Sequence, residues 1–176
     1  MQSETPDLTR NGAHGFNLSH VHIRPAAPDD AEPIRVLLHT LDVLHAERIP
    51  HLFQIPPDKT RHLSHVHHSL KDGHHFVALL EDQLIAYINL EIKKVDKDYP
   101  FLKKRCFGMI GELIVHPDFQ KLGVGKKLVQ AAEGFARARG AEDIRLQVYG
   151  FNENAHRFYQ QLGYENLAFQ MSKRFK

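Results

Sequence analysis

Two glycines and two lysines mark the start of a helix in the segment HPDFQKLGVGKKL, residues 116–128. Gly123 and Gly125 leave the backbone bare, and Lys126 and Lys127 add positive charge. The first N–H groups of a helix have no partner within the helix and carry the positive end of its dipole, so anions bind there. This spacing favours a helix start that binds phosphate.

Two better-known phosphate motifs do not fit this stretch. A P-loop has the pattern GxxxxGK[ST], but Gln120 stands five residues before Gly125, and Lys127 follows Lys126. A dinucleotide fingerprint has the pattern GxGxxG, but its third glycine position is Leu128. Because short glycine motifs often arise by chance, a plain turn into a helix is the alternative interpretation.

One carboxylate interrupts an otherwise apolar strand. The segment CFGMIGELIVH, residues 106–116, has apolar residues on both faces, which is typical of a central strand, and Glu112 lies within it. A charged group in such a strand needs a partner or a purpose. Burial raises the pKa of a carboxyl group towards the range of a general base. The two alternatives are a catalytic base and a salt bridge to a lysine or arginine of a neighbouring element.

The elements that must position these groups alternate along the chain. The predicted strands are 20–26, two within 75–95, 106–116, 143–150, and one or two within 164–175. The predicted helices are 27–49, 59–73, 125–140 and 152–163. Asp29 or Asp30 is expected to cap the first helix, and Asn152 the last. This order predicts an α/β fold, an α+β sandwich with antiparallel and parallel strand pairs.

The surroundings of the glycines resemble the signature of the GNAT superfamily, the acyl-CoA-dependent N-acyltransferases. The pattern (Gln/Arg)-x-x-Gly-x-(Gly/Ala) is met by Gln120, Lys121, Leu122, Gly123, Val124 and Gly125, after a strand ending Val115-His116-Pro117. A second pattern of the family is met by Asn152, Ala155, Phe158, Tyr159, Gly163 and Tyr164. The resemblance covers residues 20–175.

The resemblance implies a mixed, mostly antiparallel sheet of six to seven strands flanked by helices. The fourth and fifth strands are expected to splay apart, often beside a bulge. A single domain is expected over residues 20–176, after a polar tail at residues 1–19. Related enzymes often dimerise, and Phe169, Met171 and Phe175 are the expected interface side chains.

The resemblance also implies acetyl-CoA as the acyl donor. The N–H groups of residues 121–126 would hold its pyrophosphate, and the edge at residues 113–115 would pair with its pantetheine arm. Lys126 or Lys127 would contact the 3′-phosphate. The implied cofactor-contacting residues are Leu113, Ile114, Val115, Gln120, Lys121, Leu122, Gly123, Val124, Gly125, Lys126 and Asn152.

Acetyl transfer to a primary amine requires a base and an acid. The amine must lose a proton, because an alkylammonium group has a pKa near ~10, and the leaving thiolate must gain one. The resemblance assigns the acid to Tyr159, for which packing in the core is the alternative role. It assigns the base to Glu112 acting through a water, with His116 as the alternative base. A backbone N–H near residues 114–115 would polarise the thioester carbonyl.

A group of histidines lies between residues 62 and 75. Its members are His62, His65, His67, His68, His74 and His75. A metal site would need three or four ligands converging on one point, and the resemblance implies no metal. We expect a solvated surface that gains positive charge in mild acid.

Composition excludes several other classes of function. The net charge of +2 is too small for a typical nucleic-acid binder, and one cysteine excludes an internal disulfide. No apolar run approaches the ~20 residues of a membrane span, and the first residues lack the apolar core of a signal peptide. These features predict a soluble, cytoplasmic protein without nucleic-acid or membrane partners.

The acceptor amine is not specified by the sequence. The acceptor pocket is expected around residues 44–53, Tyr87, Asn89, Glu91 and the loop 96–104. A small amine, similar to an aminoglycoside or polyamine, is the first expectation, and a protein N-terminus or lysine is the second. The other function considered is a module that binds acyl-CoA as a sensor without turnover. Cofactor binding without transfer to any of a panel of amines would distinguish it.

Overall fold

The computed structural model describes residues 17–56, 61–95, 101 and 103–175. The α-helices are α1 (Ala31–Arg48), α2 (Leu63–Asp72), α3 (Val124–Ala138) and α4 (Glu153–Gln161). The strands are β1 (Val21–Pro25), β2 (His74–Leu80), β3 (Gln83–Lys94), β4 (Cys106–Val115) and β5 (Asp143–Arg145). Short 3-10 turns are η1 (Leu18–His20), η2 (Pro28–Asp30) and η3 (Pro117–Phe119).

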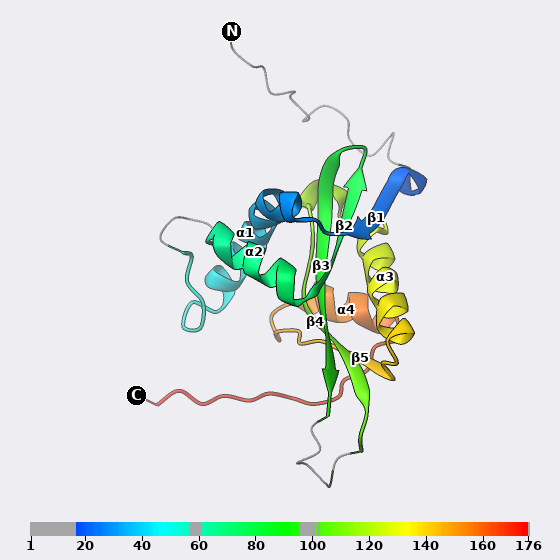
Figure 1. The fold of residues 1–176 in the computed structure, drawn as a ribbon. Coiled ribbons are helices and arrows are strands. Elements are labelled where there is room, and N and C mark those ends of the chain that lie inside the picture. Colours follow the sequence, from blue (N-terminus) through cyan, green and yellow to red (C-terminus); the bar gives the residue numbers. More distant parts are fainter. Residues whose placement is uncertain (1–16, 57–60, 96–100, 102, 176) are drawn as a thin grey trace.

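The strands form one sheet in the order β1-β2-β3-β4-β5. The first three pairs are antiparallel, and β4 pairs with β5 in parallel. Helices α1 and α2 lie on one side of the sheet, and α3 and α4 lie on the other (Figure 1). The predicted mixed, mostly antiparallel α/β fold is therefore confirmed.

The predicted number of strands is wrong. The described residues contain five strands rather than six or seven. Strand β5 covers residues 143–145 instead of 143–150, and residues 165–175 form no strand. A strand needs a neighbour to receive its backbone hydrogen bonds, and this C-terminal segment runs away from the body of the molecule (Figure 1).

The sheet separates two apolar clusters. On the side of α3, Phe76 and Ala78 of β2 pack in one cluster with Leu128. On the side of α1, Val77 packs in another cluster with Ile34. This alternation along β2 follows the period of two in a strand, and burying both faces fixes the register of the sheet.

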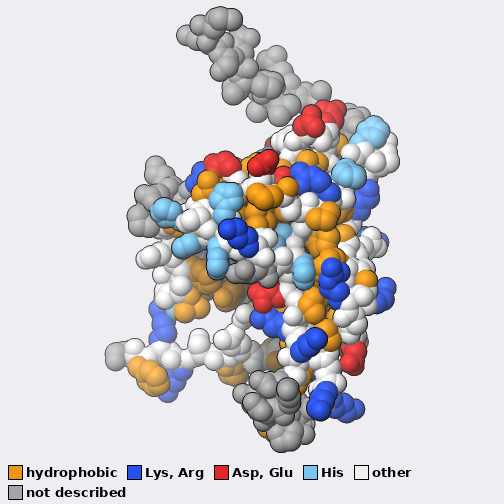
Figure 2. Space-filling view, in the orientation of Figure 1, with side chains coloured by type: hydrophobic (Ala, Val, Ile, Leu, Met, Phe, Trp, Pro, Cys, Tyr) orange, Lys and Arg blue, Asp and Glu red, His pale blue; other side chains and the backbone are white. Residues whose placement is uncertain are grey.

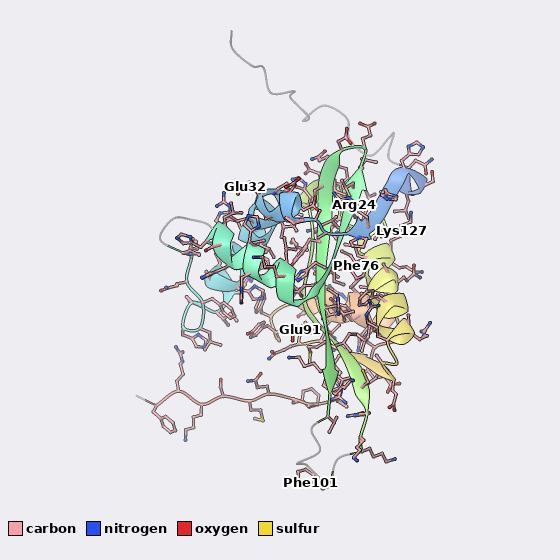
Figure 3. The ribbon with its side chains drawn as sticks, viewed as in Figure 1. Arg24, Glu32, Phe76, Glu91, Phe101 and Lys127 are labelled. Carbon is pink, nitrogen blue, oxygen red and sulfur yellow. The ribbon has the colours of Figure 1, made fainter. Side chains whose placement is uncertain are left out.

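The fold begins before the predicted domain boundary at residue 20. Leu18 packs against the α3-side cluster. The Lys127 ammonium donates hydrogen bonds to the carbonyls of Leu18 and Val21, at 2.7 and 3.4 Å. Figure 3 shows Lys127 on α3 near β1. Residues 17–19 of the predicted tail at residues 1–19 therefore contact the folded body, and residues 1–16 lie outside the described part of the chain.

The cap predicted for the first helix takes another form. Asp30 precedes α1 but makes no side-chain hydrogen bond to the helix backbone. Its carboxylate accepts from the Ala27 N–H and binds both terminal nitrogens of Arg24. The hydrogen bonds from Arg24 lower the pKa of Asp30. This ion pair fixes β1 to the start of α1.

Candidate active site

Strands β4 and β5 diverge, as predicted. Their pairing ends at Met109↔Arg145, yet β4 continues to Val115. Residues 146–149 follow β5 without joining the sheet. The edge of β4 from Ile110 to Val115 that faces away from β3 is therefore open. Apart from the Val115 carbonyl, which accepts from the Gln120 amide, the outward backbone groups of this edge have no strand partner among the described residues and could pair with an extended ligand.

A bulge interrupts the pairing of β3 with β4 beside this open edge. The register shifts between Ile88 and Leu90, so Asn89 stands opposite both Gly111 and Glu112. The Asn89 side-chain oxygen accepts the N–H groups of Gly111 and Glu112, at 3.0 and 2.6 Å. This side chain satisfies donors that the bulge removes from the ladder.

The bulge changes which residues of β4 face each side of the sheet. Before it, Ile110 packs in the α3-side cluster. After it, Leu113 and Val115 pack there, and Ile114 packs on the α1 side. Even-numbered residues thus face α3 before the bulge and α1 after it. As a result, Glu112 faces α1 and not the apolar cluster beneath α3.

Glu112 is held in a network of charged side chains. Arg61 donates from Nη1 to Glu112 and from Nε and Nη2 to the Asp42 carboxylate of α1, the latter at 2.9 and 2.6 Å. The second oxygen of Glu112 lies 3.5 Å from the Asn89 amide nitrogen. Burial opposes the charge of Arg61, but the hydrogen bonds and charges of both carboxylates raise its pKa above the usual value. Glu112 thus forms a salt bridge with Arg61, which is the alternative to a catalytic base that the sequence left open.

The start of α3 presents bare backbone at the end of β4. Gly123 has φ +88°, and a Cβ there would lie 3.0 Å from a methyl of Leu18, so the fold itself requires glycine. At Gly125 an added Cβ would make only ordinary contacts, 3.4 Å from Phe158 and 3.5 Å from Val115. Packing therefore does not require glycine at the second position.

The N–H groups at this helix start point out of the helix. Its first i→i+4 hydrogen bond runs from the Lys127 N–H to the Gly123 carbonyl, so the N–H groups of residues 124–126 precede it. The Gln120 amide donates to the Val115 carbonyl at 3.1 Å, which ties the glycine segment to β4. Lys126 is exposed, whereas the Lys127 ammonium is engaged with the N-terminal segment. The N–H groups of residues 124–126 and the positive charge of Lys126 therefore lie together at the end of the open β4 edge.

Tyr159 lies on the opposite side of the sheet from Glu112. It is 8% exposed and packs between Phe158 and Tyr164, with ring centroids 5.0 and 5.3 Å away. Burial raises the pKa of the Tyr159 hydroxyl, so this phenol stays protonated at neutral pH. Asn152 caps α4 by accepting the Ala155 N–H at 3.0 Å, as predicted.

An aromatic cluster adjoins the charged network on the α1 side. His45 lies 5.0 Å from Phe53, 5.3 Å from Tyr149 and 5.7 Å from Phe151, measured between ring centroids. His45 is three residues after Asp42 on α1, so the two share one helix face. The cluster joins α1, the loop that follows it, and the segment after β5.

The sequence pointed to some of these residues and missed others. His45, Phe53 and Asn89 lie within the predicted acceptor region. Asp42 and Arg61 were missed because their contacts to Glu112 depend on packing between distant segments. An arginine just before an amphipathic helix carried no specific signal. The predicted acceptor loop at residues 96–104 falls mostly outside the described residues.

His116, the alternative base, lies at the far end of β4. Its Nδ1 accepts the Asp118 N–H at 3.4 Å, and its ring lies 5.8 Å from the ring of Phe119. The side chain is 36% exposed. It is held by the turn η3 rather than by the network around Glu112.

The histidine segment differs from the predicted solvated surface. His75 is buried: its Nε2 lies 2.7 Å from the Ser69 carbonyl and its Nδ1 lies 2.9 Å from the Tyr87 hydroxyl. Because a carbonyl only accepts, Nε2 carries the proton and Nδ1 accepts from Tyr87. Burial lowers the pKa of His75 and of His74, whose ring is tilted against Phe135 with the centroids 4.4 Å apart.

The other histidines of this segment match the prediction of exposure. They are His62, His65, His67 and His68. Within the residues that the structure describes, no three histidine, cysteine or acidic side chains are grouped so as to hold a metal ion. Nor is any helix in that part of the chain long and apolar enough to cross a membrane.

A splayed strand pair that ends at a glycine-rich helix start defines an acyl-CoA-dependent acyltransferase fold. Residues 40–164 match the family model described as Acetyltransferase (GNAT) family, which is well over half of the chain. The chain belongs to the GNAT acetyltransferase family, whose members use acyl-CoA. This confirms the family that the two sequence motifs indicated.

Relatives with curated names are N-acetyltransferases. An aminoalkylphosphonate N-acetyltransferase of Salmonella typhimurium is 30% identical over 100 residues, which cover 57% of this chain and 62% of that protein. An uncharacterised N-acetyltransferase of Methanocaldococcus jannaschii is 38% identical over 64 residues, 36% of this chain and 28% of that protein. The chain thus spans less than two thirds of the length of either relative.

The fold also matches solved structures. The crystal structure of a mutant protein from Bacillus halodurans superimposes with a TM-score of 0.82. It is 22% identical in sequence, and the match covers 88% of this chain and 99% of that one. At this identity, the likeness establishes the fold alone.

Proposed function

We propose that this protein is an N-acetyltransferase that moves the acetyl group of acetyl-CoA to a primary amine. The observation that carries the proposal is the open edge of β4 from Ile110 to Val115, which ends at the bare helix start of Gly123 and Gly125. An extended acyl-thioester arm needs a strand edge, and a pyrophosphate needs converging N–H donors. Here the two lie end to end.

The donor would lie along β4. The N–H groups of residues 121–126 would bind its pyrophosphate, and Lys126 its 3′-phosphate. Lys127 is less suited to that role, because its ammonium already binds two backbone carbonyls. The pantetheine arm would pair with residues 113–115, and a free N–H of β4 would polarise the thioester carbonyl. A metal has no part in this arrangement.

The acid and the base would act from opposite sides of the sheet. The acceptor amine enters from the α1 side, where Glu112 takes its proton through a water. The amine nitrogen then forms a bond to the thioester carbon, and the carbon–sulfur bond breaks. Tyr159, from the α3 side, gives its proton to the departing sulfur, and the second proton that the nitrogen sheds as it becomes an amide passes through water and restores the phenol. Burial raises the pKa of Tyr159, so the phenol carries its proton at neutral pH.

Arg61 would act as a positioning residue for the base. It bridges Glu112 to Asp42 and so holds the carboxylate on the side where the amine enters. The aromatic side chains His45, Phe53 and Tyr149 would form the apolar wall of the acceptor site. A small amine fits such a wall, and the similarity to an aminoalkylphosphonate N-acetyltransferase supports that class of acceptor.

A thiol-release assay tests the proposal. The chain is incubated with acetyl-CoA and a panel of amines that includes an aminoalkylphosphonate and an aminoglycoside, and free CoA is measured. We expect release that depends on one class of amine. Binding of acetyl-CoA without release in any member of the panel would support the sensor alternative.

Gly125→Asp is the variant that tests the donor site. An aspartate in the first turn suits a helix, yet its charge repels a pyrophosphate. Gly134→Asp on the same helix is the matched control, because a Cβ at Gly134 meets nothing within 4 Å. We expect acetyl-CoA to raise the melting temperature of the wild type and of the control but not of Gly125→Asp. No rise in any of the three would overturn the donor assignment.

A further inference from the structure

His75 is a buried histidine whose two ring nitrogens both have partners. It is 6% exposed, whereas Figure 2 shows other histidine side chains gathered at the surface over α1 and α2. Its Nε2 lies 2.7 Å from the Ser69 carbonyl in the last turn of α2, and its Nδ1 lies 2.9 Å from the Tyr87 hydroxyl. A Cβ at Gly73 would lie 2.6 Å from Nε2, so glycine leaves room for this ring. The ring is therefore held in one position and in one tautomer.

The proton of the Tyr87 hydroxyl has one direction available. Because Nε2 of His75 carries the ring proton, Nδ1 accepts the proton of Tyr87, and the lone pairs of the hydroxyl can then only accept. Burial and the charge of Glu112 raise the pKa of Tyr87. Hydrogen bonds to its oxygen from Ser69 and Asn89 oppose this rise in pKa. Since Tyr87 is 1% exposed, its contacts are with protein groups alone.

Asn89 connects the Tyr87 hydroxyl to Glu112. Its side-chain oxygen is committed to the backbone N–H groups of Gly111 and Glu112, at 3.0 and 2.6 Å. The amide nitrogen therefore faces the other way, toward the Tyr87 hydroxyl and toward the second oxygen of Glu112, 3.5 Å away. A flipped amide would set donor against donor at the two backbone N–H groups. A Tyr87 oxygen that only accepts favours the same orientation of the Asn89 amide as the backbone does.

The sheet brings these side chains together on its α1 side. His75 of β2 stands opposite Asn89 of β3, and Tyr87 is two residues from Asn89 on the same side of that strand. The bulge places Glu112 beside Asn89. Arg61 binds one carboxylate oxygen of Glu112, and the Asn89 amide lies at the other. Glu112 is thus held from two sides, by an ion pair and by a chain of neutral groups.

We propose that His75 and Tyr87 are positioning residues for Glu112, which they orient through the Asn89 amide. The inference rests on the proposed function, in which Glu112 takes the proton of the acceptor amine. Neutral His75 accepts the Tyr87 proton and so keeps it from turning toward Asn89. Asn89 then holds the bulge and keeps Glu112 on the side where the amine enters. Without an acceptor at position 75, the Tyr87 proton is released and the Asn89 amide loosens.

Two substitutions of His75 separate positioning from packing. Glutamine offers a donor and an acceptor, as neutral imidazole does, whereas phenylalanine fills the buried site and offers neither. We expect His75→Phe to lower kcat by about 10-fold with little change in either KM, and His75→Gln to keep kcat within about threefold of the wild type. A role in packing alone reverses this order, because a buried site tolerates phenylalanine better than an amide.

The same substitutions one residue earlier are the matched controls. His74 lies against Phe135 on the α3 side, so His74→Phe and His74→Gln should leave kcat unchanged. A wild-type kcat in His75→Phe, or a lower kcat in His75→Gln than in His75→Phe, would overturn the proposal.

Tyr87→Phe tests the next residue of the chain. The substitution removes the hydroxyl and keeps the ring in the α1-side cluster. We expect kcat to fall by about 10-fold, with no further fall when Tyr87→Phe is combined with His75→Phe, because the two residues act through one chain. If the two losses multiply in the double variant, His75 and Tyr87 act independently and the proposal is wrong.

Amide hydrogen exchange of the free protein tests the chain without a substrate. The backbone N–H groups of Gly111 and Glu112 both donate to Asn89. Exchange measured by NMR should be about 10-fold faster at these two groups in His75→Phe and Tyr87→Phe than in the wild type, His75→Gln or His74→Phe. Unchanged exchange in both variants would overturn the proposal even in an active enzyme. If exchange is faster but no amine is acetylated, the proposed function fails while the chain from His75 to Asn89 is supported.

Discussion

The two faces of β4 hold their ionisable groups by opposite means. On the α1 side, Glu112 is surrounded by Arg61, Asp42 and Asn89, so its charge is compensated by an ion pair and hydrogen bonds. On the α3 side, Tyr159 lies among aromatic rings, and burial keeps its proton in place. One face thus offers a carboxylate held by an ion pair and hydrogen bonds, and the other a phenol that burial keeps protonated.

The largest expected effect comes from removing the carboxylate of the polar face. Glu112→Gln keeps the shape of the side chain but cannot accept a proton, so we expect kcat to fall by about 10²–10⁴-fold. Glu142→Gln, in the loop before β5, is the matched control, since the Glu142 side chain is exposed and lies outside the proposed site. Steady-state kinetics with the best amine measures both. Equal kcat values for Glu112→Gln and wild type would move the base to His116 or elsewhere.

The next effect concerns the apolar face. Tyr159→Phe removes the proton donor and keeps the ring in the cluster, so kcat should fall by about 10²-fold while the melting temperature changes little. Kinetics and thermal unfolding on the same preparation check both expectations. If kcat stays within threefold of the wild type, Tyr159 has only its packing role.

A smaller effect is expected from the positioning residue. Arg61→Ala frees Glu112 and leaves Asp42 unpaired, so we expect kcat to fall by about 10-fold, with partial recovery in Arg61→Lys. The matched control is Arg24→Ala, which breaks a similar arginine–aspartate pair at the start of α1. Both should lower stability by about 1–3 kcal/mol. A loss of kcat in both variants alike would mean that the effect of Arg61 is structural only.

The smallest effect is a pH dependence of stability. Burial holds the pKa of His75 below its unfolded value near ~6.5. Below that pH the unfolded chain binds a proton that the folded chain does not, so the free energy of unfolding falls as the pH falls from about 6.5. Urea unfolding at pH 7.5 and 5.5 should show this loss in the wild type and a smaller loss in His75→Gln. An unchanged loss in the variant would assign the slope to other groups.

The sequence predicted those parts of the site that local patterns encode. Short motifs predicted three features: the glycine-rich start of α3, the capping of α4 by Asn152, and packing in the core as an alternative role for Tyr159. The apolar runs within residues 75–95 likewise indicated the strands β2 and β3. Local chemistry therefore suffices where a feature is built within one turn or one strand.

Features built between segments were not predictable in the same way. The side to which Glu112 points depends on the bulge held by Asn89, which reverses the alternation of β4. Its partner Arg61 is 51 residues away in the chain. The absence of a strand at residues 165–175 has a similar origin, because an apolar alternating segment becomes a strand only where an edge is within reach. Contacts between distant segments, and not the local propensity for helix or strand, decide the orientation of Glu112, its partner and the lack of a strand at residues 165–175.

Amide hydrogen exchange with and without acetyl-CoA tests most directly whether the open edge of β4 and the helix start form one donor site. We predict that acetyl-CoA slows exchange at residues 113–115 and 121–126 together, in the wild type and in Gly134→Asp but not in Gly125→Asp. Protection confined to other segments, or none at saturating acetyl-CoA, would contradict the site.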